Sequence, residues 1–252
     1  MAVKGDQILL YAVQYATYAV EVWVCIALVW GGRWRRLKGL GLYVASLFLL
    51  DGVARPAVSN FFGPKSQQFY YFYWLTDVVF ALGAFLVICG FFRRACAKEE
   101  KMWGLVKHLL VLVFLIVLGF TGLSITRHYT DLYSNFIFEF SQNLYFTCLV
   151  LNTLLYVLLQ QFAVEDDELG LLVCGMGVQF AGEAACFALL HLTAAPVVVM
   201  ALTRFLAPVC TLAMLSIWVY AVGKTPQTQT VSERYQRGRS VGLVEAVAEA
   251  AK

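Results

Sequence analysis

The sequence predicts an all-α integral membrane bundle of seven transmembrane helices, and three observations lead to this fold class. Hydrophobic residues make up 61% of the chain and charged residues 14%, whereas soluble domains are about half apolar and a quarter charged. The mean hydropathy is +0.72. The apolar residues gather into runs of roughly 20 or more, which is the length that crosses a bilayer core of about 30 Å. The same composition excludes a disordered or nucleic-acid-binding chain.

Seven apolar runs mark the expected helices. Their bounds are 7–30, 39–60, 69–92, 103–126, 135–161, 169–192 and 196–222. The breaks between them contain glycine, proline or charged residues, as in Phe62-Gly63-Pro64-Lys65 and in the acidic stretch 165–168. Because no loop is long enough to fold by itself, we expect a transmembrane domain over 1–223 and a cytoplasmic tail over 224–252.

The expected tail begins with polar residues and ends in a stretch rich in alanine and valine, 241–251. A short amphipathic helix that lies on the membrane or on a partner is compatible with this stretch. A solvated, disordered tail is equally compatible with it.

Basic residues predict how the helices are oriented. Lysines and arginines gather in the loops after the first and third spans and in the tail, whereas the opposite side has only Lys4, Lys65 and Arg127. The positive-inside rule then places the N-terminus outside and the C-terminus in the cytoplasm. We expect a multi-pass protein of a bacterial-type plasma (inner) membrane.

Ionisable residues inside the spans are the strongest functional signal, because each costs several kcal/mol in lipid unless it is paired or hydrated. All of them lie in the middle or the outer half of their spans, where other polar residues share their helix faces. The predicted ligand-binding or polar cluster consists of Glu21, Asp51, Arg55, Asp77, Glu139, Gln142, Asn143, Gln179, Glu183 and Arg204.

This polar cluster contains five acids and two arginines. Full ionisation would leave three negative charges in excess in a medium of low dielectric, so protons, a cation, a ligand amine or water must compensate. One interpretation is an outward-facing polar pocket. The other is a structural network that fixes helix register, with Asp51 and Arg55 paired at i, i+4 spacing.

Several familiar functions lack their residues here. A retinal protein needs a lysine in the core of the last span, and that span has none. His108, His128 and His191 do not face one another at mid-membrane, which argues against a haem held by two histidines. No ligand set for a metal and no catalytic motif is visible, so we predict neither a cofactor nor enzymatic activity.

Small residues on the sixth span indicate close helix packing. They are Gly177, Ala181, Ala185 and Ala188. Packing inside the bundle is the simpler explanation. Packing against a second copy or another membrane subunit is the alternative.

Two local features resemble a known family. They are the basic loop Arg33-Trp34-Arg35-Arg36 after the first span, and the aromatic run Phe69-Tyr70-Tyr71-Phe72-Tyr73-Trp74-Leu75-Thr76-Asp77 that opens the third. Over about its first hundred residues the chain resembles an uncharacterised bacterial family of seven-span membrane proteins with minimal loops. The resemblance implies the topology and no activity.

The leading hypothesis is therefore a membrane binding protein, a receptor or sensing subunit, whose outward-facing intramembrane pocket holds a small polar or cationic ligand. The first alternative is a small-solute or proton-coupled transporter, which requires a polar route continuing inward from the cluster. The second alternative is a non-catalytic subunit of a larger membrane complex.

Overall fold

The computed structural model describes residues 2–30, 34, 37–63, 66–97, 100–125, 132–161, 166–192 and 196–224. Within these ranges the side chains of 2–7, 100, 124–125, 132–136, 138, 190–192, 196–204 and 224 are not described. All elements in the described ranges are helical. The tail expected over 224–252 lies outside the described residues, apart from the backbone of Lys224.

The seven expected spans are present as long helices that are apolar enough to cross a membrane. The first is α1 (Ala2–Trp30), and the second is built from α2 (Lys38–Leu47), the π-helix η2 (Phe48–Ala54) and α3 (Arg55–Phe62). The others are α4 (Gln67–Ala95), α5 (Glu100–Ile125), α6 (Leu132–Gln161), α7 (Asp167–Leu192) and α8 (Pro196–Lys224). The all-α fold class and the seven membrane-length helices are confirmed.

Local sequence explains where helices end and begin. Gly63 follows α3 with φ of 85°, a conformation that glycine adopts without a steric penalty. The Ser66 hydroxyl then caps α4 by accepting the Phe69 N–H at 3.1 Å. At the start of α7, the Asp166 carboxylate accepts the Leu169 N–H at 3.2 Å.

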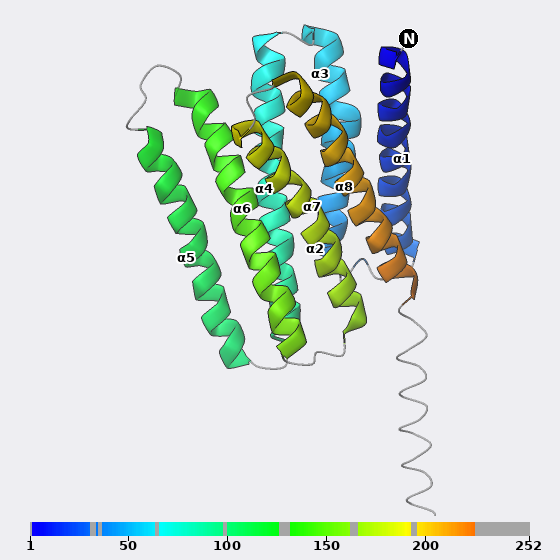
Figure 1. The fold of residues 1–252 in the computed structure, drawn as a ribbon. Helices are drawn as coiled ribbons and strands as arrows, with labels where there is room; N and C mark the ends of the chain where they lie inside the picture. Colours follow the sequence, from blue (N-terminus) through cyan, green and yellow to red (C-terminus); the bar gives the residue numbers. More distant parts are fainter. Residues whose placement is uncertain are drawn as a thin grey trace, which may run out of the picture.

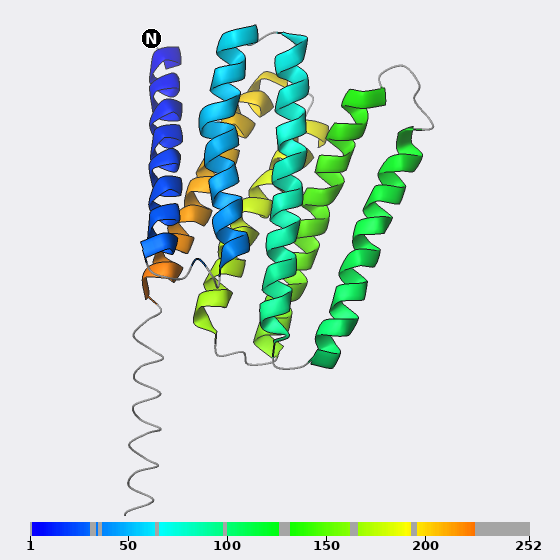
Figure 2. The ribbon, with the colours of Figure 1, turned by 180° about the vertical axis from the view of Figure 1, so that it is seen from behind.

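The helices run alternately in opposite directions through one bundle (Figures 1 and 2). In Figure 1, α5 lies at one edge and packs against α6, while α1 lies at the other edge and packs against α8 and α2. We call the end at which α1 begins the upper end, and the end at which α8 finishes the lower end. Exposed leucines on α5, such as Leu105 and Leu115, form the apolar surface that lipid chains are expected to cover.

Apolar side chains fill the lower half of the bundle. The most deeply buried include Val24, Leu28, Val44, Ile88, Leu155, Leu172, Met176, Leu215 and Trp218. The Trp218 indole donates to the Leu172 carbonyl oxygen at 3.0 Å, which joins α8 to α7. Gly175 makes this approach possible, because a Cβ atom there would lie 2.7 Å from Trp218 Nε1.

The predicted small-residue face of α7 divides between two environments. Gly177 faces α6, where a Cβ atom would lie 3.0 Å from Asn152 Nδ2. Ala181 and Ala188 are exposed, and Ala185 is half-buried. Gly177 therefore serves packing inside the bundle, while contact of the alanines with another chain stays a prediction.

An ion cluster joins α4 to α7 at the lower end. Arg94 donates to Asp166 with both Nε and Nη2 at 2.9 Å, and its Nη2 also donates to Glu168 at 2.6 Å. Glu168 is only 2% exposed. The acidic stretch after the fifth span, which has no basic residue of its own, thus contacts an arginine from the last turn of α4.

Candidate ligand-binding site

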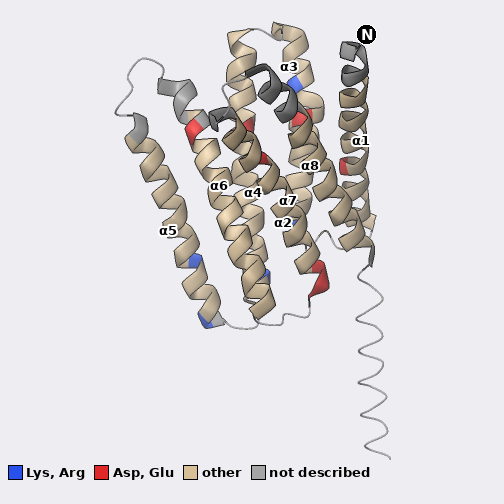
Figure 3. Cartoon of the chain, in the orientation of Figure 1, with Lys and Arg blue, Asp and Glu red and all other residues tan. Residues whose placement is uncertain are grey.

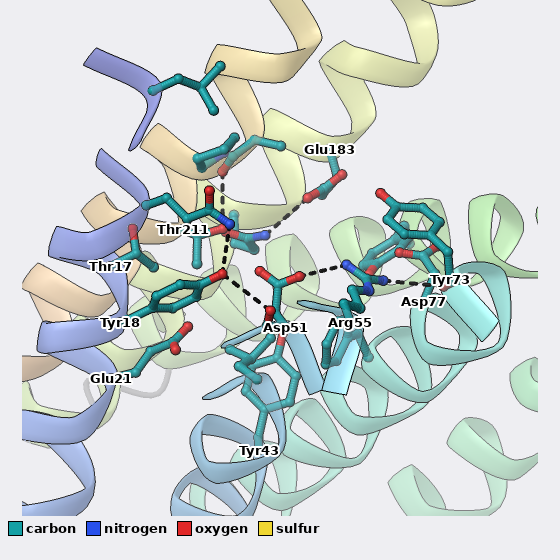
Figure 4. Close-up of a pocket in the computed structure, with 18 residues that line it drawn as sticks. Thr17, Tyr18, Glu21, Tyr43, Asp51, Arg55, Tyr73, Asp77, Glu183 and Thr211 are labelled. Atoms are coloured by element: carbon teal, nitrogen blue, oxygen red, sulfur yellow. Dashed lines mark hydrogen bonds and ion pairs between the residues drawn. The ribbon is translucent and has the colours of Figure 1, made fainter. Parts of the chain in front are cut away.

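A cavity of about 350 Å³, whose lining Figure 4 shows in close-up, lies among residues of the middle and upper bundle. Side chains of α1, α2, η2, α3, α4, α6, α7 and α8 line it. Six members of the predicted polar cluster are among them: Glu21, Asp51, Arg55, Asp77, Gln179 and Glu183. Figure 3 shows that the acidic positions of the described chain gather in the middle and upper bundle, apart from those at the start of α7. The fold thus brings predicted residues from four spans to one cavity.

One stripe of α1 supplies the wall of the cavity nearest the N-terminus. Gln14, Tyr18 and Glu21 follow i, i+4, i+7 spacing, and all three line the cavity. Gln14 donates an Nε2–H to the Tyr18 hydroxyl at 2.7 Å. Tyr11, which precedes Gln14 at i, i+3 spacing, is 59% exposed instead and does not line the cavity.

Arg55 is held firmly by its neighbours. Its Nη1 donates to Asp51 Oδ1 at 2.8 Å, which confirms the predicted i, i+4 pair. Its Nε donates to Thr76 Oγ1 at 2.9 Å, and its Nη2 donates to the Tyr73 carbonyl oxygen at 3.3 Å. The guanidinium also lies over the Tyr73 ring, 4.1 Å from the centroid. These contacts tie α3 to α4 and fix the cation at one side of the cavity.

The second span is irregular where it borders the cavity. Its π-helical segment contains Asp51, and Pro56 follows in the first turn of α3. Such departures from α-helical geometry interrupt the regular hydrogen-bond ladder and are common at functional sites. The π-helical segment was not predicted, although Pro56 could have indicated an irregularity here.

Two buried side chains on the cavity wall have an oxygen without a hydrogen-bond partner. Glu21 is 2% exposed and Gln179 is 7% exposed. Glu21 Oε2 and Gln179 Oε1 accept no hydrogen bond in the structure, and each unsatisfied buried acceptor carries a free-energy cost of about 1–3 kcal/mol. Both side chains therefore offer acceptors that a ligand or water can satisfy.

The remaining carboxylates lie on the far side of the cavity from Glu21 (Figure 4). Asp77 of α4 and Glu183 of α7 are close enough to influence each other, and Gln179 donates to Glu183 Oε1 at 3.2 Å. Tyr43 lies between the two sides, within electrostatic range of Glu21, Asp77 and Glu183. The acids are thus distributed around the cavity wall.

The charges described on the cavity wall do not balance. Glu21, Asp51, Asp77 and Glu183 face it with the single described cation Arg55. The side chain of Arg204, the second arginine of the predicted cluster, lies outside the described residues. Even with its charge added, two carboxylates would remain in excess. Within the described residues, moreover, the acids do not converge into a group of three or more that could hold a metal ion.

Three members of the predicted cluster, all on α6, do not line the cavity. Asn143 donates to Thr121 Oγ1 of α5 at 3.5 Å, and Glu139 and Gln142 are half-buried elsewhere on the helix. Their part of α6 lies near its upper end, and the helix presents Tyr145 to the cavity instead. Helical spacing alone could not indicate which neighbouring helix these three residues face.

Aromatic side chains complete the wall, and none of them was in the predicted cluster. Tyr18, Tyr43, Tyr73, Phe80 and Tyr145 line the cavity. Phe80 follows Asp77 at i, i+3 spacing, so helical periodicity could have indicated it. Tyr43 could have been found in the same way, because Tyr43, Leu47 and Asp51 follow one another at i, i+4 spacing and all line the cavity.

Comparisons of the chain with protein-family models, with curated proteins and with solved structures find no match. The resemblance to an uncharacterised seven-span family therefore stays a prediction.

Proposed function

We propose that this chain is an integral membrane binding protein, receptor-like or a sensing subunit, that takes a small organic cation into the cavity. The observation that carries the proposal is the excess of carboxylates on a wall where Arg55 is already bonded to Asp51, Thr76 and Tyr73. A bound cation would compensate the excess charge and satisfy the buried oxygens of Glu21 and Gln179.

Aromatic rings favour an organic cation over a bare metal ion. Tyrosine and phenylalanine faces attract ammonium groups through their quadrupoles. The rings of Tyr43, Tyr73, Phe80 and Tyr145 on the wall supply such faces beside the carboxylates. The distributed acids are likewise better suited to an extended ligand than to one ion.

The apolar lower half favours binding over transport. Below the cavity, each helix continues with deeply buried apolar residues such as Leu28, Val44 and Leu215. A transporter would need a polar route through this region. The irregular second span and Pro208 in α8, both at the cavity, are the features that support the transporter alternative, since broken helices line transporter binding sites.

Ligand-dependent thermal stability tests the proposal. The full chain in mild detergent is heated with 1-aminobutane, with the neutral isostere 1-butanol and with the anion butyrate. The amine should raise the unfolding temperature saturably, because a ligand at 100 Kd stabilises by about 2.7 kcal/mol, and the isosteres should not. Equal shifts with amine and alcohol, or no shift with the amine, would contradict the proposal.

Matched variants test whether the amine raises the unfolding temperature by binding in the cavity. Asp77→Asn removes a carboxylate from the cavity wall and should weaken the amine-dependent shift. Glu139→Gln removes an acid that lies in the same upper part of the bundle but does not line the cavity. The shift should therefore survive in Glu139→Gln, and its equal loss in both variants would point to a general charge effect.

Transport is measured separately, in proteoliposomes loaded with the same amine. Retention of the amine in the vesicles, together with saturable binding, supports the receptor-like role. Release that depends on the protein would select the transporter alternative.

A further inference from the structure

The acceptor groups of the cavity form two sites rather than one. At one side, Glu21 of α1 is buried, and its Oε2 has no hydrogen-bond partner. At the other side, Asp77 of α4 and Glu183 of α7 both line the cavity. Figure 4 places Glu21 and this pair on opposite sides of the cavity.

The region between the two sites is suited to a hydrocarbon chain. Tyr43 lies between them, and Leu47, Phe80 and Tyr145 add apolar surface to the wall. Burying methylene groups against such surface is favourable by the hydrophobic effect. A ligand that spans the cavity would therefore place its charged ends at the acids and its apolar part between them.

Arg55 lies within electrostatic range of Asp77 and Glu183, but its three nitrogens already donate to other residues. Its Nε, Nη1 and Nη2 are all engaged by residues on η2 and α4, and its charge is matched by Asp51. Asp51 in turn accepts from Arg55 through Oδ1. The two sites that remain for a ligand are Glu21 and the Asp77–Glu183 pair.

From this arrangement we infer that the preferred ligand class is a linear aliphatic diamine, with one ammonium group at Glu21 and the other at Asp77 and Glu183. The inference rests on the proposed function and makes it more specific. A dication matches the excess of at least two carboxylates, whereas a monoamine leaves one site with an uncompensated charge. The cavity volume of about 350 Å³ accommodates a short diamine.

Calorimetric titration of the full chain in lipid nanodiscs tests the inference. The probes are 1,4-diaminobutane and 1-aminobutane, which differ in one ammonium group. The diamine should bind roughly tenfold tighter or more, because a charge-assisted hydrogen bond to a buried carboxylate is worth at least that factor. Equal affinities would overturn the diamine inference while leaving the proposed function intact. No binding of either amine would overturn both.

Variants of Glu21 test whether this residue binds one of the two ammonium groups of the diamine. Glu21→Gln keeps the shape of the side chain, and it should reduce diamine affinity to about that of 1-aminobutane. Glu21→Asp retains the carboxylate and should keep part of the diamine preference. Glu139→Gln, outside the cavity, is the matched control and should keep the full preference for the diamine.

Monodisperse elution and an unchanged unfolding temperature verify that each variant is folded. A full diamine preference in a folded Glu21→Gln variant would overturn the assignment.

Discussion

The Tyr18 hydroxyl donates to the main-chain carbonyl oxygen of Asp51 at 3.2 Å, and this bond joins α1 to the π-helical segment of the second span. The sequence explains why that carbonyl is available. In the i→i+5 register, the Arg55 N–H bonds to the Leu50 carbonyl oxygen, so the next donor would be residue 56, which is a proline without an N–H. Tyr18 supplies the missing donor from a neighbouring helix.

Replacing Tyr18 by phenylalanine should therefore destabilise the bundle by about 1–2 kcal/mol, since it leaves the Asp51 carbonyl without this donor in a buried setting. The effect should shrink in a Pro56→Ala background, because alanine restores a main-chain N–H. Unfolding of the four proteins of this double-mutant cycle in detergent measures the coupling. Tyr15→Phe, at a tyrosine that is 70% exposed, is the control. Additive effects of Tyr18→Phe and Pro56→Ala would contradict the explanation.

Arg55 should not tolerate replacement by lysine. The guanidinium forms bonds through Nε, Nη1 and Nη2 and lies over the Tyr73 ring, and an ammonium group on a flexible stem cannot reproduce this planar arrangement. We expect Arg55→Lys to lower stability by about 1–3 kcal/mol. Arg93→Lys, at an exposed position of α4, should be nearly neutral in the same thermal unfolding assay. Equal stability of the two variants would show that charge alone matters at position 55.

Much of the fold followed from the sequence because each membrane helix can be recognised from its own apolar segment. Apolar length defined the seven spans, and breaks such as 62–65 contained the glycine that ends α3. The i, i+4 pair of Asp51 and Arg55 was also local, and it is present. These features depend only on residues within one or two helical turns.

The parts that could not be predicted depend on contacts between distant helices. Nothing near Asn143 indicates that it faces Thr121 of α5 rather than the cavity. Likewise, Arg94 in the last turn of α4 and Glu168 in the first turn of α7 are 74 positions apart, and only the packing of α4 beside α7 brings them together. Helical periodicity defines a face of one helix, whereas a site requires the rotation of each helix relative to its neighbours.

The ion cluster at the lower end should be essential for stability. Arg94 contacts Asp166 and the buried Glu168 together, so its removal takes a positive charge away from a carboxylate that is 2% exposed. Removing one partner of a buried ion pair costs about 3–5 kcal/mol. We therefore expect Arg94→Met to unfold at a much lower temperature than Arg93→Met, a matched control at the adjacent exposed arginine. Similar losses in both would show that Arg94 acts only as a surface charge.

Close packing of α7 against α8 should depend on Gly175. An added Cβ atom would lie 2.7 Å from Trp218 Nε1 and 3.3 Å from the Met214 carbonyl oxygen. The indole would have to move and lose its bond to Leu172. Gly175→Ala should cost about 1–3 kcal/mol, as overpacking of a filled core does. Gly170→Ala on the same helix, where no atom lies within 4 Å of the new methyl group, should be neutral in chemical unfolding. A neutral Gly175→Ala would mean that the two helices separate without cost.

The distribution of basic residues predicts that the lower end faces the cytoplasm. Lys38 at the start of α2, Arg93 and Arg94 at the end of α4, and Lys101 and Lys107 on α5 all lie at or near this end, and positive charges are retained on the cytoplasmic side. A fluorescent protein fused after Lys252 should therefore fold and fluoresce in a bacterial host, while an alkaline phosphatase fusion at the same place should be inactive. Exchanging the basic residues of 33–38 and 93–101 for glutamine should weaken this preference, because acidic and neutral residues contribute little to orientation. Active phosphatase in the unaltered chain would reverse the topology and place the cavity nearer the cytoplasm.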